Sequence, residues 1–273
     1  MFLLPSFAGV GIFILVPFLD VVRRSFANAA GTAFTGLENY KTVLTNKAFY
    51  LAAGNTFRFL AVCIPLLLVL SLGAALLLNS FQKGRKLIKA AFLMPMAIPV
   101  AAVVLFWRLA FDRAGIFNQM LSLFGLDGVD WMHTGASFYV LVFAYLWRNL
   151  GYDMVLWLAG LAAIPQNVYE AARMDGAGRR QIFRYITLPL LLPYLFLTGV
   201  LSLVNGFKVY REAWLISGNY PQDSIYMLQH VFNNWFLKLD IQKMTAAAVM
   251  TALVLGIILA VVQIFNERWE QRE

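Results

Sequence analysis

The polar side chains best suited to binding a solute lie within a long apolar run, residues 137–161. Four of them recur at three- and four-residue intervals: Tyr145, Arg148, Asn149 and Tyr152. This spacing places them on one face of a helix. Aromatic rings can stack on the C–H faces of a sugar, while amides and guanidinium groups hydrogen-bond its hydroxyls. These residues, together with Asn205 in a later apolar run, are the predicted lining of a solute pathway.

The charged residues of the run 137–161 could instead have a structural role. Arg148 and Asp153 could form an interhelical pair that holds a helix bundle, because charges deep in apolar helices usually face a partner or a cavity. No nucleophile, base and orienting group occur together, and neither His133 nor His230 has a second ligand beside it. The single Cys63 excludes an intrachain disulfide. Neither a catalytic site nor a metal site is expected.

A basic, partly polar segment, residues 164–189, interrupts the apolar runs and is predicted to form two short helices. Asn167 and Glu170 have the three-residue spacing of a capping box, which begins a helix. Gly176 can adopt the left-handed conformation that ends one, and a second amphipathic helix is expected over residues 179–186. Two such helices would form a compact docking element. The simpler alternative is a loop whose arginines only follow the distribution of charge across a membrane.

Composition places these segments in a polytopic membrane protein. Of the 273 residues, 61% are hydrophobic and 13% charged, whereas soluble domains are about half apolar and about a quarter charged. A helix needs about 20 apolar residues to cross a bilayer. Six runs qualify: residues 2–22, 53–79, 90–111, 137–161, 187–207 and 244–265. The first is expected to be a span and not a cleavable signal peptide, because no basic region precedes it and no small-residue cleavage site follows.

Lysine and arginine gather in two of the loops, residues 81–89 and 164–186, and are sparser in the others. Cytoplasmic loops carry the excess of these residues, so both chain ends and the docking element are expected to be cytoplasmic. The net charge of +8 then indicates topology and not a nucleic-acid partner, since no basic domain stands apart from the spans. The predicted fold is a single all-α membrane domain, residues 1–273, with six transmembrane helices and a two-helix cytoplasmic loop between spans four and five.

That loop resembles the signature loop of the membrane subunits of bacterial binding-protein-dependent ABC importers. The signature reads Glu-Ala-Ala, three residues, Gly, nine residues, Ile, one residue, Leu-Pro. It falls here on Glu170, Ala171, Ala172, Gly176, Ile186, Leu188 and Pro189. Asp175, Gly176 and Ala177 resemble the form found in the sugar-permease branch. Residues 36–40, 94–99, 115–118 and 151–165 are also similar to that branch, whereas residues 217–221 depart from its Gly-Gly-Pro segment.

The resemblance implies one of two permease subunits of an ATP-driven importer for a sugar or oligosaccharide, in the bacterial cytoplasmic membrane. Its implied partners are a second permease, an ABC ATPase dimer and an extracytoplasmic solute-binding protein. Glu170 would make polar contacts with the ATPase, Ala171 and Ala172 would pack closely, and Gly176 would form the turn. The chain would not be an enzyme and would hold no cofactor. It contains no phosphate-binding loop, and ATP would be bound by the partner ATPase.

Two other functions compete with this one. The same architecture could import an amino acid, a phosphate ester or a metal, although the sugar-type outer loops and the Asp-Gly-Ala form argue against it. A self-contained channel or secondary carrier would often show inverted repeats with paired broken helices, and none is evident. A membrane-embedded enzyme would need a catalytic constellation that the sequence does not offer.

Overall fold

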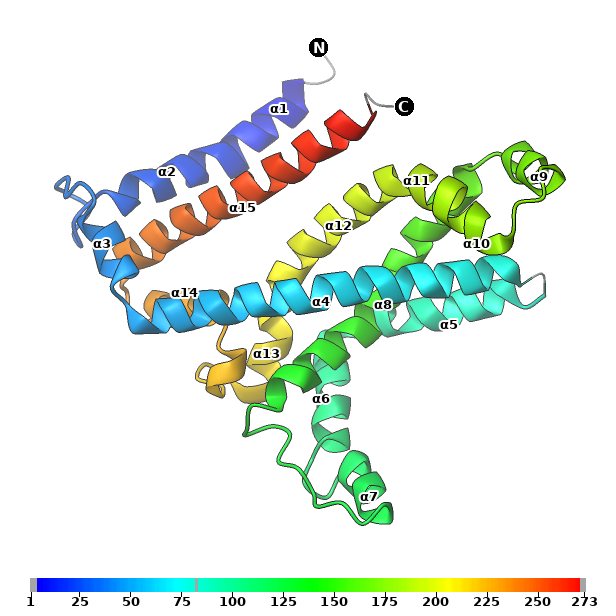
Figure 1. Ribbon diagram of the computed structural model, residues 1–273. Helices are drawn as coiled ribbons and strands as arrows, with labels where there is room; N and C mark the ends of the chain where they lie inside the picture. The colour runs from blue at the N-terminus through cyan, green and yellow to red at the C-terminus, as the bar shows by residue number, and fades with distance from the viewer. Residues whose placement is uncertain (1–3, 82, 271–273) are drawn as a thin grey trace. The chain divides into compact units, whose positions relative to one another are not determined.

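The computed structural model describes residues 4–81 and 83–270, which are predominantly helical and form no β-strand. Figure 1 labels the α-helices. They are α1 (Leu4–Val10), α2 (Val16–Ser25), α3 (Glu38–Leu44), α4 (Lys47–Ser80), α5 (Arg85–Ala97), α6 (Val100–Ala110), α7 (Ile116–Leu123), α8 (Ser137–Ala163), α9 (Gln166–Met174), α10 (Arg179–Ile182), α11 (Leu188–Leu190), α12 (Leu192–Gly206), α13 (Tyr210–Ser217), α14 (Leu228–Leu237) and α15 (Ile241–Glu270). The predicted start of the first span, at residue 2, lies outside the described residues.

Among the described residues, four helical stretches are long and apolar enough to cross a membrane. They are Leu4–Ser25, Lys47–Ser80, Leu192–Ile216 and Ile241–Arg268. A fifth would be the pair α5 and α6, which is bent by 94°. The remaining predicted run, residues 137–161, lies in one helix, α8, which carries Arg148 and Asp153 and is not among the four. Helical structure continues beyond residue 207, the predicted end of the fifth span, through α13 to Ile216.

The bend between α5 and α6 has a local cause. Proline disfavours helical backbone in the residue before it, and Ile98, which precedes Pro99, is extended with φ −77° and ψ 135°. Pro99 then occupies the N-cap position of α6. The predicted run 90–111 is therefore two helices that meet at an angle. The break places the start of α6 beside the polar face of α8.

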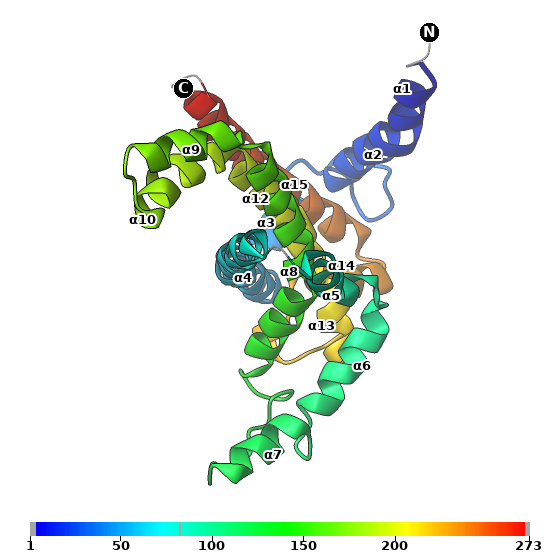
Figure 2. The same ribbon diagram turned by 90° about the vertical axis from the view of Figure 1, so that its right-hand side faces the viewer.

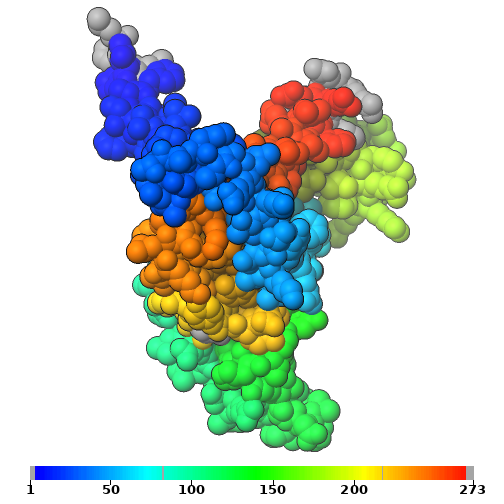
Figure 3. Space-filling view, turned by 90° about the vertical axis from the view of Figure 1, so that its left-hand side faces the viewer, coloured from blue at the N-terminus to red at the C-terminus, as the bar shows by residue number. Residues whose placement is uncertain are grey.

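The chain divides into two compact units. Unit 1 comprises residues up to 56 and residues 226–261, and unit 2 comprises residues 57–225 and those from 262 onward. In unit 1, α14 packs on the first turns of α4. The rings of Phe49 and Trp235 stack there with centroids 6.5 Å apart, and Asn55 donates a hydrogen bond to the Tyr226 carbonyl at 3.0 Å. Figure 3 shows this face of unit 1, with α4 in blue and α14 in orange.

His230 closes the first turn of α14. Its side chain is fully buried, and its Nδ1 accepts a hydrogen bond from the backbone N–H of Met227 at 3.0 Å, as the third residue of a capping box does. Burial lowers the pKa of His230 from 6.5 to about 4, because the charged imidazolium would lose its hydration. The histidine that the sequence left without a role is thus a neutral helix cap.

We expect this histidine to make the stability of the protein pH-dependent. Between pH 6.5 and about 4 the unfolded chain takes up a proton at His230 and the folded chain does not, so the free energy of unfolding falls as the pH falls. The loss through this window is on the order of 3 kcal/mol. His230→Gln retains a capping side chain that does not titrate, so its thermal unfolding in detergent should lose this part of the pH dependence. An unchanged pH profile in the variant would contradict the assignment.

In unit 2, α8 is the central helix. The indole of Trp157 is fully buried and donates a hydrogen bond to Ser71 of α4 at 2.9 Å. Gly151 lies directly against the backbone carbonyl of Phe92 in α5, where an added Cβ would overlap the oxygen. Small residues at such crossings allow membrane helices to approach closely. Asp153 is buried and accepts a hydrogen bond from Ser202 of α12 at 2.6 Å. These contacts fix the orientation of α8 and hence of its polar face.

Candidate functional site

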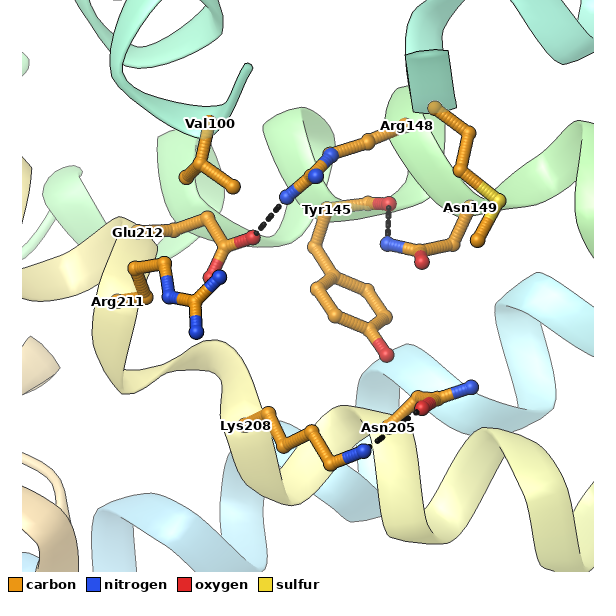
Figure 4. Close-up of a pocket in the computed structure, with 9 residues that line it drawn as sticks. Val100, Tyr145, Arg148, Asn149, Asn205, Lys208, Arg211 and Glu212 are labelled. Carbon is orange, nitrogen blue, oxygen red and sulfur yellow. Dashed lines mark hydrogen bonds and ion pairs between the residues drawn. The ribbon is translucent and has the colours of Figure 1, made fainter. Parts of the chain in front are cut away.

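A cavity of about 180 Å³ lies in unit 2, where α8 faces the break between α5 and α6 and the end of α12 (Figure 4). Each element contributes to its lining. α8 supplies Tyr145, Arg148 and Asn149, the broken pair supplies Met96 and Val100, and the end of α12 with the helical turns after it supplies Asn205, Lys208, Arg211 and Glu212. Most of these side chains are polar. The cavity is therefore a polar site enclosed by largely apolar helices.

An ion pair joins α8 to α13 across this cavity. Arg148 donates a hydrogen bond from Nη1 to Oε1 of Glu212 at 2.8 Å. The two side chains are 19% and 9% exposed, so each charge would lack compensation without the other. The alternative prediction, a pair between Arg148 and Asp153, is wrong. Asp153 instead accepts a hydrogen bond from Ser202 of α12. An interhelical pair does exist, but Arg148 forms it with a residue that the sequence did not single out.

The structure brings together four of the five residues predicted to line a pathway: Tyr145, Arg148, Asn149 and Asn205. Tyr152 is not part of this lining. Tyr152 follows Tyr145 by seven positions, so it lies on the same face of α8 but about 10 Å further along the helix axis. Asn149 also turns back toward its own helix, where Nδ2 donates to the Tyr145 carbonyl at 2.9 Å.

Sequence analysis missed three charged residues of the lining: Lys208, Arg211 and Glu212. Their charges end the apolar run, so hydropathy alone predicts a loop after residue 207. The helical stretch continues instead, and Lys208 and Glu212 follow Asn205 at intervals of three and seven residues, which repeats one helical face. That periodicity was the signal that could have identified them.

Two polar atoms in the cavity wall have no hydrogen-bond partner in the described structure. They are the hydroxyl of Tyr145 and Nε of Arg148, both of them buried. Buried polar atoms usually find a partner, and those that do not require an explanation. The ring of Tyr145 is held edge-on to Phe59 with centroids 5.4 Å apart, and its hydroxyl is directed toward Asn205 (Figure 4). These two atoms are unsatisfied polar groups in the wall of the cavity.

A wider hollow of about 810 Å³ lies further along α13 in the same unit. The rings of Trp214 and Tyr220 belong to its lining, together with Arg108, Asp112 and other side chains. Both rings are exposed. His133, at the edge of this hollow, binds Asp130 at 3.0 Å. No group of three His, Cys, Asp or Glu side chains that could hold a metal occurs among the described residues.

The basic segment folds as a hairpin of α9 and α10 that joins α8 to α11 and α12 (Figures 1 and 2). The predicted helix end is confirmed, because Gly176 has φ +80° and Ala177 donates to the Ala172 carbonyl at 2.9 Å. The predicted start is wrong, because α9 begins at Gln166 after Pro165, and Asn167 lies inside it. The second helix is α10, which continues as the π-helical turn Phe183–Thr187.

The signature residues occupy distinct positions on this hairpin. Glu170 and Ala171 are exposed on α9, whereas Ala172 is buried. A shallow hollow of about 290 Å³ runs between the glycine turn and the π-helical turn, lined by Asp175, Gly176, Ala177, Gln181, Ile182, Tyr185 and Ile186. Leu188 and Pro189 form the start of the next helical stretch. The hairpin thus presents exposed polar groups and a hollow beside its turn.

Comparison with solved structures identifies the fold. The chain superposes on a subunit of a bacterial ABC transporter involved in the import of the acidic polysaccharide alginate, with a TM-score of 0.87 over 98% of this chain and 94% of that one. The two sequences are 23% identical, so the likeness shows the fold. The chain therefore shares the fold of one chain of that transporter.

The family follows from sequence. The family model described as binding-protein-dependent transport system inner membrane component matches residues 67–273. The trehalose/maltose transport system permease protein MalF of Thermococcus litoralis is 35% identical over 225 residues, or 80% of this chain and 76% of that protein. The arabinooligosaccharides permease AraP of Bacillus subtilis is 32% identical and covers 76% of this chain and 68% of its own length. The chain belongs to this family of membrane transport components, as the signature loop predicts.

The Arg148–Glu212 pair should be far more important for stability than an exposed pair. Arg148→Gln removes the hydrogen-bonded counter-charge of the buried Glu212 carboxylate and should cost about 3–5 kcal/mol. Replacing both residues with apolar ones, Arg148→Met with Glu212→Leu, should restore most of the loss. Arg113→Gln, which removes the exposed pair with Asp130, should cost less than about 1 kcal/mol. Thermal unfolding in detergent measures all three, and equal effects of the two single variants would contradict this assignment.

Proposed function

We propose that the chain is one of two permease subunits of an ATP-driven ABC importer, and that its cargo is a sugar or oligosaccharide. The observation that carries the proposal is the 35% identity to a trehalose/maltose permease across 80% of the chain. The name of the Bacillus subtilis relative also specifies an oligosaccharide. A polar cavity and an aromatic hollow in one unit are in keeping with such a cargo.

The proposed assembly contains a second permease, an ABC ATPase dimer, an extracytoplasmic binding protein and the lipid membrane. One of the alginate transporter structures is a complex with a pentasaccharide-bound periplasmic protein, which supports a binding protein as a partner here. ATP would be bound and hydrolysed by the ATPase, and this chain would hold no cofactor. Six spans with both chain ends in the cytoplasm complete the proposal.

The arrangement of the basic loops supports that orientation. The turn between α4 and α5 and the α9–α10 hairpin both lie at the same end of unit 2 (Figures 1 and 2). Ile88, just after that turn, and Tyr169 of α9 pack on one core cluster. The excess of basic residues in the two loops then lies on a single side of the membrane, as expected for the cytoplasmic side.

In this proposal the α9–α10 hairpin is the coupling element. Its signature residues would contact the ATPase: Glu170, Ala171, Ala172, Asp175, Gly176, Ala177, Ile186, Leu188 and Pro189. Movement of the hairpin would be transmitted to α8, which ends at Ala163, and to the helices that begin at Leu188. The solute would pass the polar face of α8, where Tyr145, Arg148 and Asn149 lie opposite Asn205, with Tyr152 further along the same face.

Gly176→Pro tests the coupling role. Proline fixes φ near −65°, so it cannot adopt the φ of +80° found at Gly176, and the turn must change shape. We expect uptake of labelled oligosaccharide by cells to fall to background while the chain remains inserted in the membrane. A pull-down from native membranes should recover less ATPase with the variant. Gly125→Pro, which disrupts a similar turn at φ +70° between α7 and α8, is the matched control and should retain the ATPase.

Two results would contradict the proposal. Normal uptake by Gly176→Pro would remove the coupling role of the hairpin. A wild-type chain that is recovered alone, with neither an ATPase nor a second permease, would contradict the importer assembly itself.

A further inference from the structure

The charges that line the cavity in unit 2 are unbalanced. Three basic side chains belong to its lining: Arg148, Lys208 and Arg211. They share a single carboxylate, that of Glu212, which accepts a hydrogen bond from Arg148 at 2.8 Å. Nζ of Lys208 lies 3.5 Å from the amide oxygen of Asn205. Arg211 forms no salt bridge within the part of the chain that the structure describes. The lining therefore carries an excess of positive charge.

Membrane topology does not account for this excess. α12 begins beside the basic hairpin and ends at the cavity, so Lys208 and Arg211 lie at the opposite end of that helix (Figure 1). Basic residues are enriched on the cytoplasmic side and are expected to be sparse on the other. Two cations that line one cavity at the far end are better explained by what the cavity binds.

The wall around these cations is also arranged for a negatively charged group. The hydroxyl of Tyr145 is nine-tenths buried and has no partner among the described atoms. Val100, the first residue of α6, lies in the lining, so the positive end of this eleven-residue helix lies at the cavity wall. Arg148 retains an unpaired buried Nε. These donors do not belong to Lys208 or Arg211, and they too favour a negatively charged ligand.

The side chains of the lining suit an acidic cargo better than a neutral one. A neutral sugar would be recognised by aromatic faces and by hydrogen-bond donors balanced with acceptors. Guanidinium and ammonium groups bind carboxylate, sulfate or phosphate through charge-assisted hydrogen bonds. The rings that can stack on a sugar, Trp214 and Tyr220, lie in the separate hollow along α13. At about 180 Å³, the cavity is smaller than the ~300 Å³ or more of a drug-sized site and suits one acidic unit of a longer chain.

We propose that the cargo is an acidic glycan, and that its anionic group binds in this cavity to Lys208 and Arg211. Tyr145 donates a hydrogen bond to the same unit, and Asn205 orients Lys208. This inference rests on the proposed function, because it names the chemical class of the cargo that the permease carries. Arg148 remains paired with Glu212 and contributes through its free Nε.

The test is binding to the permease complex purified in detergent without its binding protein, so that the selectivity of the binding protein does not contribute. Two acidic probes are each compared with a neutral counterpart: trigalacturonate with its methyl ester, and glucose 6-phosphate with glucose. At least one acid should bind about tenfold or more tightly than its neutral form, and added salt should weaken the acid selectively. Lys208→Gln with Arg211→Gln should remove the preference, and Lys208→Arg with Arg211→Lys should retain it. Arg113→Gln, outside the cavity, should change nothing.

The outcomes distinguish this proposal from the one it rests on. If neither acid binds more tightly than its neutral counterpart, or if the double glutamine variant retains the preference, the acidic cargo is wrong. If a neutral glycan still binds, the proposed function as a sugar permease stands. If no glycan binds and the purified complex also contains no ATPase, the proposed function is wrong as well.

Discussion

The ion pair between Arg148 and Glu212 is the interaction on which the rest of the site depends. A charge within an apolar span is costly unless it meets a counter-charge or a water-filled cavity. Arg148 has both, because its guanidinium binds Glu212 and also lines a polar space. The pair requires α13 to continue from α12 as part of one helical stretch, which brings Asn205 and Lys208 to the same wall. The ion pair and the cavity thus share one wall.

The neighbouring elements maintain that arrangement by other means. Gly151 allows α5 to lie directly against α8, and the break before Pro99 turns α6 away so that its first residue reaches the cavity. On the far side, Asp153 accepts a hydrogen bond from Ser202 and joins α8 to α12. α8 therefore has a different polar or close contact with each neighbour. The α9–α10 hairpin follows α8 directly in the chain.

Much of this organisation could be predicted from the sequence, and the remainder could not for identifiable reasons. The spacing of Tyr145, Arg148 and Asn149 gave their shared face, because helical periodicity is local. The left-handed turn at Gly176 was equally local. Hydropathy failed at Lys208 and Glu212, because a charged side chain that lines a cavity lowers the hydropathy of a helix as much as one in a loop does. The partner of Arg148 lies 64 positions along the chain, and no local pattern specifies it. Asn167 met the spacing of a capping box, yet Pro165 began the helix earlier.

The central claim is that the cavity beside Arg148 is part of a solute path open to water. The most direct measurement places a thiol there. In a Cys63→Ala background, Asn205→Cys is labelled with a membrane-impermeant thiol reagent in native membranes that contain the whole importer. The account predicts labelling that slows when an oligosaccharide-loaded binding protein and ATP are supplied, whereas Leu253→Cys, on an exposed apolar face of α15, should resist the reagent throughout. If Asn205→Cys resists labelling as Leu253→Cys does, or if cargo has no effect on its rate, the cavity is not the path.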